Sequence, residues 1–191
     1  MTKRLLNIGL GSCLLIIFLQ IFAGFYELMQ LKVLYLQYYF NGLNSFLNIL
    51  VLIILWRVLA KDYKQSQLDC ILKVMIGIST MTTLLLFLGF LHLERLVTIT
   101  IVVLSVINLI FYFIFINRLM EIEKSEINQI EQLKNYSVAF VICLFGQFIL
   151  SGIIEFNRIK GLDYISHLLI LIPIIFIGLF FMKTKDEIKQ R

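Results

Sequence analysis

Three ionisable side chains in this sequence follow a glycine at the same spacing, with two apolar residues between. The pairs are Gly24 and Glu27, Gly89 and His92, and Gly152 and Glu155. Carboxylate and imidazole groups gathered at one place can bind a cation or a substrate ammonium group. Glu94, Asp163 and His167 fall in the same parts of the sequence. The alternative is that all six are solvated helix ends, paired with the basic residues Lys32, Arg95, Arg158 or Lys160.

Nucleophilic chemistry has weaker candidates. Cys13 and Cys143 lie in the predicted cytoplasmic halves of long apolar runs and Cys70 lies in a charged cytoplasmic segment, whereas the predicted topology places both histidines on the outer side. A Cys–His pair is therefore not expected. The motifs H-E-x-x-H, G-x-S-x-G and C-x-x-C and a phosphate-binding glycine loop do not occur in the sequence. The sequence predicts a protein without catalytic activity, metal or cofactor.

Neutral amide side chains inside the apolar runs form a third group of candidates. Gln20, Asn44, Asn48 and Gln147 could line a substrate pocket, and we take them as the candidate binding residues. Their structural alternative is hydrogen bonding between helices, worth about 0.6–2 kcal/mol for each bond in a membrane. The other embedded polar residues are Ser79, Thr80, Thr82, Thr83, Thr98, Thr100, Ser105, Asn108 and Ser151.

The elements that position these residues follow from composition. Hydrophobic residues make up 60% of the 191 residues and charged residues 15%, against about 45–50% and 25% in soluble domains. Six runs contain no Asp, Glu, Lys or Arg, and each approaches the roughly 20 residues that cross a bilayer. Because they are apolar on every side, they predict helices rather than barrel strands. The expected fold is all-α, one domain over residues 1–191, with six transmembrane helices at about 5–26, 38–56, 74–91, 96–117, 135–154 and 164–182.

Basic residues give the expected orientation. Of the 17 Lys and Arg residues, only Lys32, Arg95, Arg158 and Lys160 fall on one side of this arrangement. Since basic residues concentrate in cytoplasmic loops, both termini are predicted to be cytoplasmic. The net charge of +5 then faces anionic lipid headgroups, and no nucleic-acid partner is expected. The expected location is the plasma (inner) membrane.

The longest connecting segment, residues 118–134, has apolar residues at mostly helical spacing between acidic ones. This pattern predicts an amphipathic helix that continues the fourth span. Its apolar residues could pack on the inner leaflet or on the protein itself, or dock a cytoplasmic partner. The candidate docking residues are Leu119, Ile122, Ile127 and Ile130.

Two further features concern helix pairs. The repeated Gly-x-x-ionisable pattern is compatible with three duplicated helical hairpins, and equally with chance, because glycine is frequent in transmembrane helices. Pro173 predicts a kink in the sixth span. Whether this kink is a hinge or a fixed bend is open.

Two functions remain compatible with the sequence. The first is a small-molecule-binding or transport subunit with a neutral polar pocket in the outer half of the bundle. The second is an accessory, assembly, immunity or regulatory subunit that contacts another membrane or cytoplasmic protein, or a second copy of itself. The first requires a polar cavity among Gln20, Asn44, Asn48 and Gln147, whereas a solid bundle there favours the second.

Overall fold

The computed structural model describes residues 3–28, 34–88, 94–123, 127, 129–157 and 163–190. Side chains at 26–28, 34–39, 87–88, 94–98, 148, 151–157, 163–168, 170 and 188–190 lie outside the description. The described chain is all helical and contains no strand, which confirms the predicted class. The elements are α1 (Lys3–Leu28), α2 (Leu34–Trp56), η1 (Arg57–Asp62), α3 (Ser66–Leu88), α4 (Glu94–Glu121), α5 (Ile130–Asn157) and α6 (Asp163–Gln190).

Four of these helices contain segments that are long and apolar enough to cross a membrane: Lys3–Phe25, Phe40–Asp62, Ser66–Leu86 and Ile99–Glu121. The helices generally extend past the uncharged runs of the sequence. For example, α6 continues through Lys183 to Gln190. An uncharged run marks only the part that suits hydrocarbon, whereas backbone hydrogen bonding continues the helix into the polar region.

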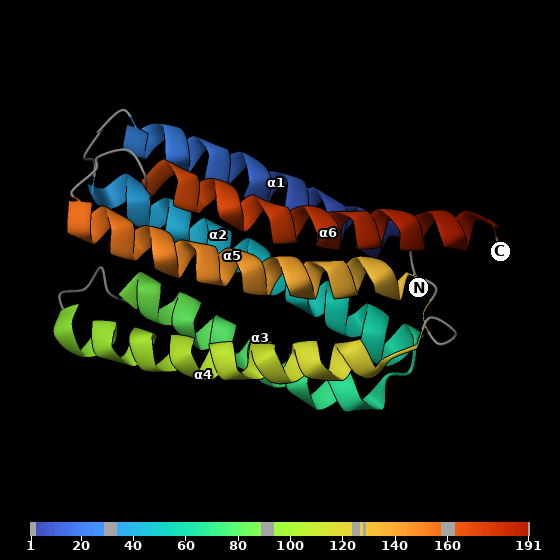
Figure 1. Ribbon diagram of the computed structural model, residues 1–191. Helices are drawn as coiled ribbons and strands as arrows, with labels where there is room; N and C mark the ends of the chain where they lie inside the picture. The colour runs from blue at the N-terminus through green and yellow to red at the C-terminus, as the bar shows by residue number, and fades with distance from the viewer. Residues whose placement is uncertain are drawn as a thin grey trace.

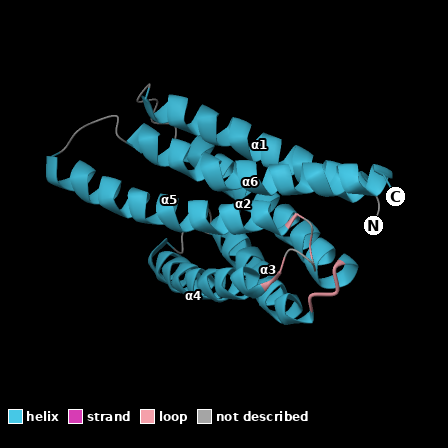
Figure 2. Cartoon of the chain, turned by 45° about the vertical axis from the view of Figure 1, so that its right-hand side comes forward, coloured by secondary structure: helices cyan, strands magenta, loops and turns pink. Residues whose placement is uncertain are grey.

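The six α-helices form a closed ring in chain order (Figure 1). Each packs against its neighbours in sequence, and α6 returns to pack along α1. The contact between α4 and α5 is far smaller than that between any other neighbouring pair of α-helices. The two ends of the chain lie at the same end of the ring. Figure 2 shows α3 and α4 as a pair below the group formed by α1, α2, α5 and α6.

The solid part of the core lies at one end of the ring, which we call the inner end because the chain termini are there. Leu6, Leu55, Leu72, Phe115 and Phe180 are each at most 1% exposed. They come from α1, α2, α3, α4 and α6, so large side chains from around the ring meet there. The inner end is therefore densely packed and closed.

The expectation of one amphipathic helix through residues 118–134 is wrong. α4 ends at Glu121, and α5 begins at Ile130. Between them the chain turns, with the amide of Ile130 donating to the carbonyl of Ile127 at 3.1 Å. Lys134 Nζ donates to the carbonyl of Met120 at 3.0 Å, which satisfies a backbone acceptor at the end of α4.

Of the alternatives considered for the apolar residues of this segment, the structure shows packing on the protein itself. Leu119, Ile122, Ile127 and Ile130 are 0–6% exposed and belong to the inner core. Their periodicity reflects packing at the junction of α4 and α5, because a turn folded inward buries its apolar side chains as a helix does. In this conformation they are not accessible to a partner.

Polar contacts fasten the inner ends of α2 and α3. Trp56 Nε1 donates to Asp69 Oδ1 at 2.8 Å, and Lys73 Nζ donates to Asp69 Oδ2 at 2.6 Å. Lys61 and Lys73 also lie over the Trp56 ring, at 5.7 and 5.8 Å from its centroid. The π-helical turn η1 joins these two helices and ends at Asp62, and the amide of the next residue, Tyr63, donates to the carbonyl of Val58 at 3.0 Å.

Candidate functional site

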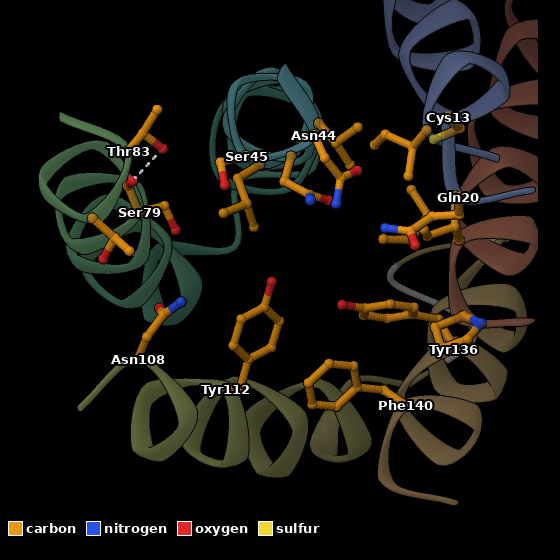
Figure 3. Close-up of a pocket in the computed structure, with 18 of the residues that line it drawn as sticks. Cys13, Gln20, Asn44, Ser45, Ser79, Thr83, Asn108, Tyr112, Tyr136 and Phe140 are labelled. Atoms are coloured by element: carbon orange, nitrogen blue, oxygen red, sulfur yellow. Dashed lines mark hydrogen bonds between the residues drawn. The ribbon is translucent and has the colours of Figure 1, made fainter. Parts of the chain in front are cut away.

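A partly open cavity of about 390 Å³ lies inside the ring, and all six α-helices contribute to its wall (Figure 3). This volume is within the range of small-molecule pockets. Much of the wall is apolar, but uncharged polar side chains interrupt it on five helices. They are Gln20 on α1, Asn44, Ser45 and Asn48 on α2, Ser79, Thr82 and Thr83 on α3, Ser105, Asn108 and Tyr112 on α4, and Tyr136 and Gln147 on α5.

The four amides selected from the sequence all line this cavity. Gln20, Asn44, Asn48 and Gln147 come from three helices, and only the ring arrangement brings them together. Cys13 also lines the cavity, so the space continues further toward the inner end than these amides alone indicate. The polar cavity that a binding or transport function requires is therefore present. That these residues bind a ligand stays a prediction.

Two amide oxygens in the lining have no hydrogen-bond partner. Asn44 Oδ1 and Asn108 Oδ1 are both buried atoms without a donor within reach. Leaving a buried acceptor unsatisfied costs about 1–3 kcal/mol. Asn44 on α2 and Asn108 on α4 both line the cavity (Figure 3), but these two oxygens are themselves buried in its wall.

Hydroxyl groups on α3 are arranged differently. Thr83 Oγ1 donates to the carbonyl of Ser79 at 2.8 Å, and Thr82 Oγ1 donates to the carbonyl of Ile78 at 3.0 Å. Each proton is thus used within the helix, while the oxygen keeps lone pairs that can accept. These hydroxyl oxygens give the α3 side of the wall hydrogen-bond acceptors.

Aromatic rings form the wall toward the inner end. Tyr112 and Phe140 stack with their centroids 4.8 Å apart and an interplanar angle of 15°. Tyr136 is tilted against Phe140 at 6.1 Å and 42°. The hydroxyl groups of Tyr112 and Tyr136 both point into the cavity (Figure 3). This surface offers flat apolar faces beside two polar groups.

None of the residues described as lining the cavity is charged. A charged ligand would need a partner of opposite charge to offset its desolvation. Neutral groups supply such compensation only weakly. Within the described part of the chain, no three His, Cys, Asp or Glu side chains are grouped as a metal site requires. The geometry therefore favours an uncharged ligand over an ion.

Several lining residues were not singled out from the sequence. Asn108 appeared only as one of many embedded polar residues, and Tyr112, Tyr136 and Phe140 were not considered. A signal was available for Tyr112, because it lies inside an apolar run rather than at an end, where tyrosines of membrane helices concentrate. Which face of α4 Asn108 occupies could not be read, since α4 has apolar residues all round.

The ionisable cluster expected at the outer ends of the helices falls outside what the structure describes. His92 is not among the described residues, and the side chains of Glu27, Glu94, Glu155, Asp163 and His167 are also outside the description. Pro173 is described, lies within α6 and contributes to the cavity wall.

Comparison with known proteins adds no family to this picture. No family model, curated protein or solved structure matches the chain. Its function has to be inferred from the cavity and the residues around it.

Proposed function

We propose that this chain is a non-catalytic, six-span protein of the plasma (inner) membrane that binds a small uncharged molecule in its central cavity. It would act as a binding or transport subunit, with both termini in the cytoplasm. Four helices with the length and hydropathy of membrane spans support this placement. The absence of Asp, Glu, Lys and Arg from all six apolar runs of the sequence supports the two further spans.

The observation that carries the proposal is the cavity of about 390 Å³, whose wall combines uncharged polar side chains from five helices with apolar and aromatic ones. Asn44 and Asn108 line it, and their amide oxygens are buried in the wall without a partner. A bundle that only had to pack would fill this space with apolar side chains. A neutral molecule that forms hydrogen bonds with the wall would occupy it instead.

The cavity limits the chemistry of such a ligand. Acceptor oxygens call for N–H or O–H groups, and a wall without charges calls for a neutral molecule. The stacked rings of Tyr112 and Phe140 suit an apolar or flat portion. The volume of about 390 Å³ is at the lower end of small-molecule pockets.

The closed inner end bears on transport. Phe115, Phe180 and Leu6 block the space between the cavity and the inner end. Transport to the cytoplasm would require these side chains to separate, driven by the ligand gradient or by a partner, whereas binding alone would not. The alternative of an accessory or regulatory subunit has less support, because Leu119, Ile122, Ile127 and Ile130 are buried within this chain.

The test compares unpaired with paired polar groups. We expect Asn44→Leu and Asn108→Leu each to stabilise the ligand-free protein by about 1–3 kcal/mol, because each removes an unsatisfied buried acceptor with little change in volume. Thr83→Val is the matched control. Its buried hydroxyl is already paired with Ser79, so its removal is expected to cost about 0.5–1.5 kcal/mol. Thermal unfolding in a mild detergent measures all three.

Native mass spectrometry of the same preparations tests binding directly. Wild-type protein extracted from its host membranes is expected to carry a small neutral adduct that the Asn44→Leu, Asn108→Leu double variant has lost. The proposal is wrong if both asparagine variants are less stable than wild type, which would assign them structural bonds. It is also wrong if the double variant retains the adduct fully.

A further inference from the structure

One residue of the described cavity wall is also exposed at the molecular surface. Of the residues that line the cavity, Ser105 is the only exposed one in the part of the chain that the structure describes. Ser105 lies near the middle of α4, which runs from Glu94 to Glu121. If α4 spans the membrane, this exposure is at the level of the hydrocarbon core rather than at either water-facing end.

The neighbouring helix explains why the wall is open there. The side chains that join α4 to α5 lie toward the inner end, where Leu119, Ile130 and Leu133 are at most 1% exposed. Along the described part of α4, only Phe115 and Leu119 are buried. Beyond that end, α4 is held mainly by α3, and its contact with α5 is slight.

The register of the two helices locates the opening. Tyr112 stacks on Phe140, and the helices are antiparallel. Ser105 lies seven residues before Tyr112 on α4, and Gln147 lies seven residues after Phe140 on α5. In antiparallel helices these equal offsets, about two turns or 10 Å, bring Ser105 opposite Gln147. Both residues line the cavity. The opening is thus a seam between α4 and α5, bordered by Ser105 and Gln147.

The side chains that border this seam differ in polarity from those that line the cavity behind it. Val102 and Val106 on α4 are 56% and 54% exposed, and Phe145 on α5 is 60% exposed. These side chains suit hydrocarbon, whereas the polar side chain of Asn108 lines the cavity inside. A molecule lying across the seam would meet polar groups at its inner part and apolar side chains at its outer part.

We propose that the cavity is entered sideways, through the seam between α4 and α5, by a neutral single-chain amphiphile. Its hydroxyl or amide head forms hydrogen bonds with the amide groups of Asn108 and Asn44, and its hydrocarbon tail passes Ser105 into the membrane. This inference rests on the proposed binding function and specifies its ligand and route. A two-chain phospholipid does not fit, because about 390 Å³ is too small and its phosphate would be buried without a cation.

The experiment uses a photoactivatable monoacylglycerol, with a diazirine in its acyl chain, and the whole protein in phosphatidylcholine nanodiscs. Wild-type protein is expected to show saturable labelling on peptides of α4 and α5. Ser105→Trp fills the seam and is expected to reduce labelling at least fivefold. Val103→Trp is the matched control, since Val103 is 51% exposed, does not line the cavity and lies two residues away. Its labelling is expected to equal that of wild type.

A second design does not depend on Ser105→Trp folding. In a background without the native cysteines, Ser105→Cys and Gln147→Cys are joined by a cleavable bismaleimide after folding. The crosslink is expected to prevent labelling, and cleavage is expected to restore it. Each single-cysteine variant, treated in the same way, controls for modification alone.

The outcomes separate the two proposals. Unchanged labelling in Ser105→Trp, or in the crosslinked protein, overturns the sideways route. Full labelling of the Asn44→Leu, Asn108→Leu double variant overturns the amide-based site itself. Loss of labelling in the double variant together with no effect at the seam keeps the binding site and rejects the route.

Discussion

Asn108 is a residue that lowers folding stability and also lines the candidate binding cavity. Its oxygen is buried without a partner, whereas the hydroxyl of Thr83 on the adjacent helix is fully used by its own backbone. Both residues were visible in the sequence as polar groups in apolar runs. Their difference depends on neighbours: a threonine bonds locally in any helix, while an asparagine depends on what the next helix presents.

Gly9 illustrates a residue whose size is fixed by packing. A Cβ at Gly9 would lie 2.9 Å from Cε2 of Phe181 and 3.3 Å from Cγ2 of Ile54, whereas a Cβ at Gly11 meets nothing within 4 Å. Because Phe181 is fully buried, its ring has little room to move. We expect Gly9→Leu to lower the free energy of unfolding by about 1–3 kcal/mol.

Gly11→Leu is the control for that substitution. It places the same side chain on an exposed position of the same helix and is expected to leave stability unchanged or slightly raised. Thermal unfolding of both variants measures the difference. Equal stability of the two would show that α1, α2 and α6 do not approach one another as closely as described.

At the scale of elements, α4 and α5 are the exceptions in the ring. The other helices are held by two substantial neighbours, but α4 packs chiefly against α3 and α5 chiefly against α6, and the two meet only toward the inner end. In the most apolar 18-residue stretch of the candidate span of α4, only 6% of the residues are buried, against 44% in the corresponding stretch for α2. A helix held on one side is the element best able to move away from α5, which is where the cavity is exposed.

The polar contacts of Asp69 at the junction of α2 and α3 allow a test of which interaction holds these two helices together. Asp69→Leu removes the acceptor of Trp56 and the partner of Lys73, whereas Asp69→Asn keeps an acceptor and loses only the charge. We expect Asp69→Leu to lower the unfolding midpoint about twice as much as Asp69→Asn, because exposed ion pairs contribute little. Fluorescence of Trp56, the only tryptophan in the chain, follows this unfolding. Equal effects would assign the stabilisation to the charge instead.

For the whole molecule, the closed inner end and the cavity beyond it make the ring asymmetric. Large side chains from around the ring fill the end where the chain termini lie, while polar and aromatic side chains surround an open space further along. A ligand could therefore reach the cavity from the outer end or from the side without disturbing the packed core. This asymmetry suits a binding protein in its resting state.

Orientation in the membrane can be tested with the native cysteines. Cys70 is exposed near the inner end, whereas Cys13 and Cys143 are buried. With both termini in the cytoplasm, a membrane-impermeant maleimide is expected to label Cys70 in inside-out vesicles and not in intact cells. Lys32→Cys in a Cys70→Ser background is expected to show the reverse pattern. Labelling of Cys70 from outside intact cells would reverse the proposed topology.

The sequence by itself determined the helical class, the approximate position of each helix and which amides lie inside. These predictions follow from local properties, because an uncharged apolar run of about 20 residues can form few structures in a membrane. The four selected amides were found in this way. The segment 118–134 was misread, since the apolar spacing of an inward-folded turn resembles that of a helix.

Only the tertiary structure decided which polar residues share one cavity and which are satisfied elsewhere. When a helix is apolar all round, its sequence does not indicate which face packs against its neighbours. In α4, apolar residues occur on every face. Whether Asn108 has a partner, whether Ser105 is exposed, and where Tyr112 meets Phe140 depend on how α4 packs between α3 and α5. Such contacts join residues far apart in the chain, so the physical reason lies in packing between helices rather than in any local pattern.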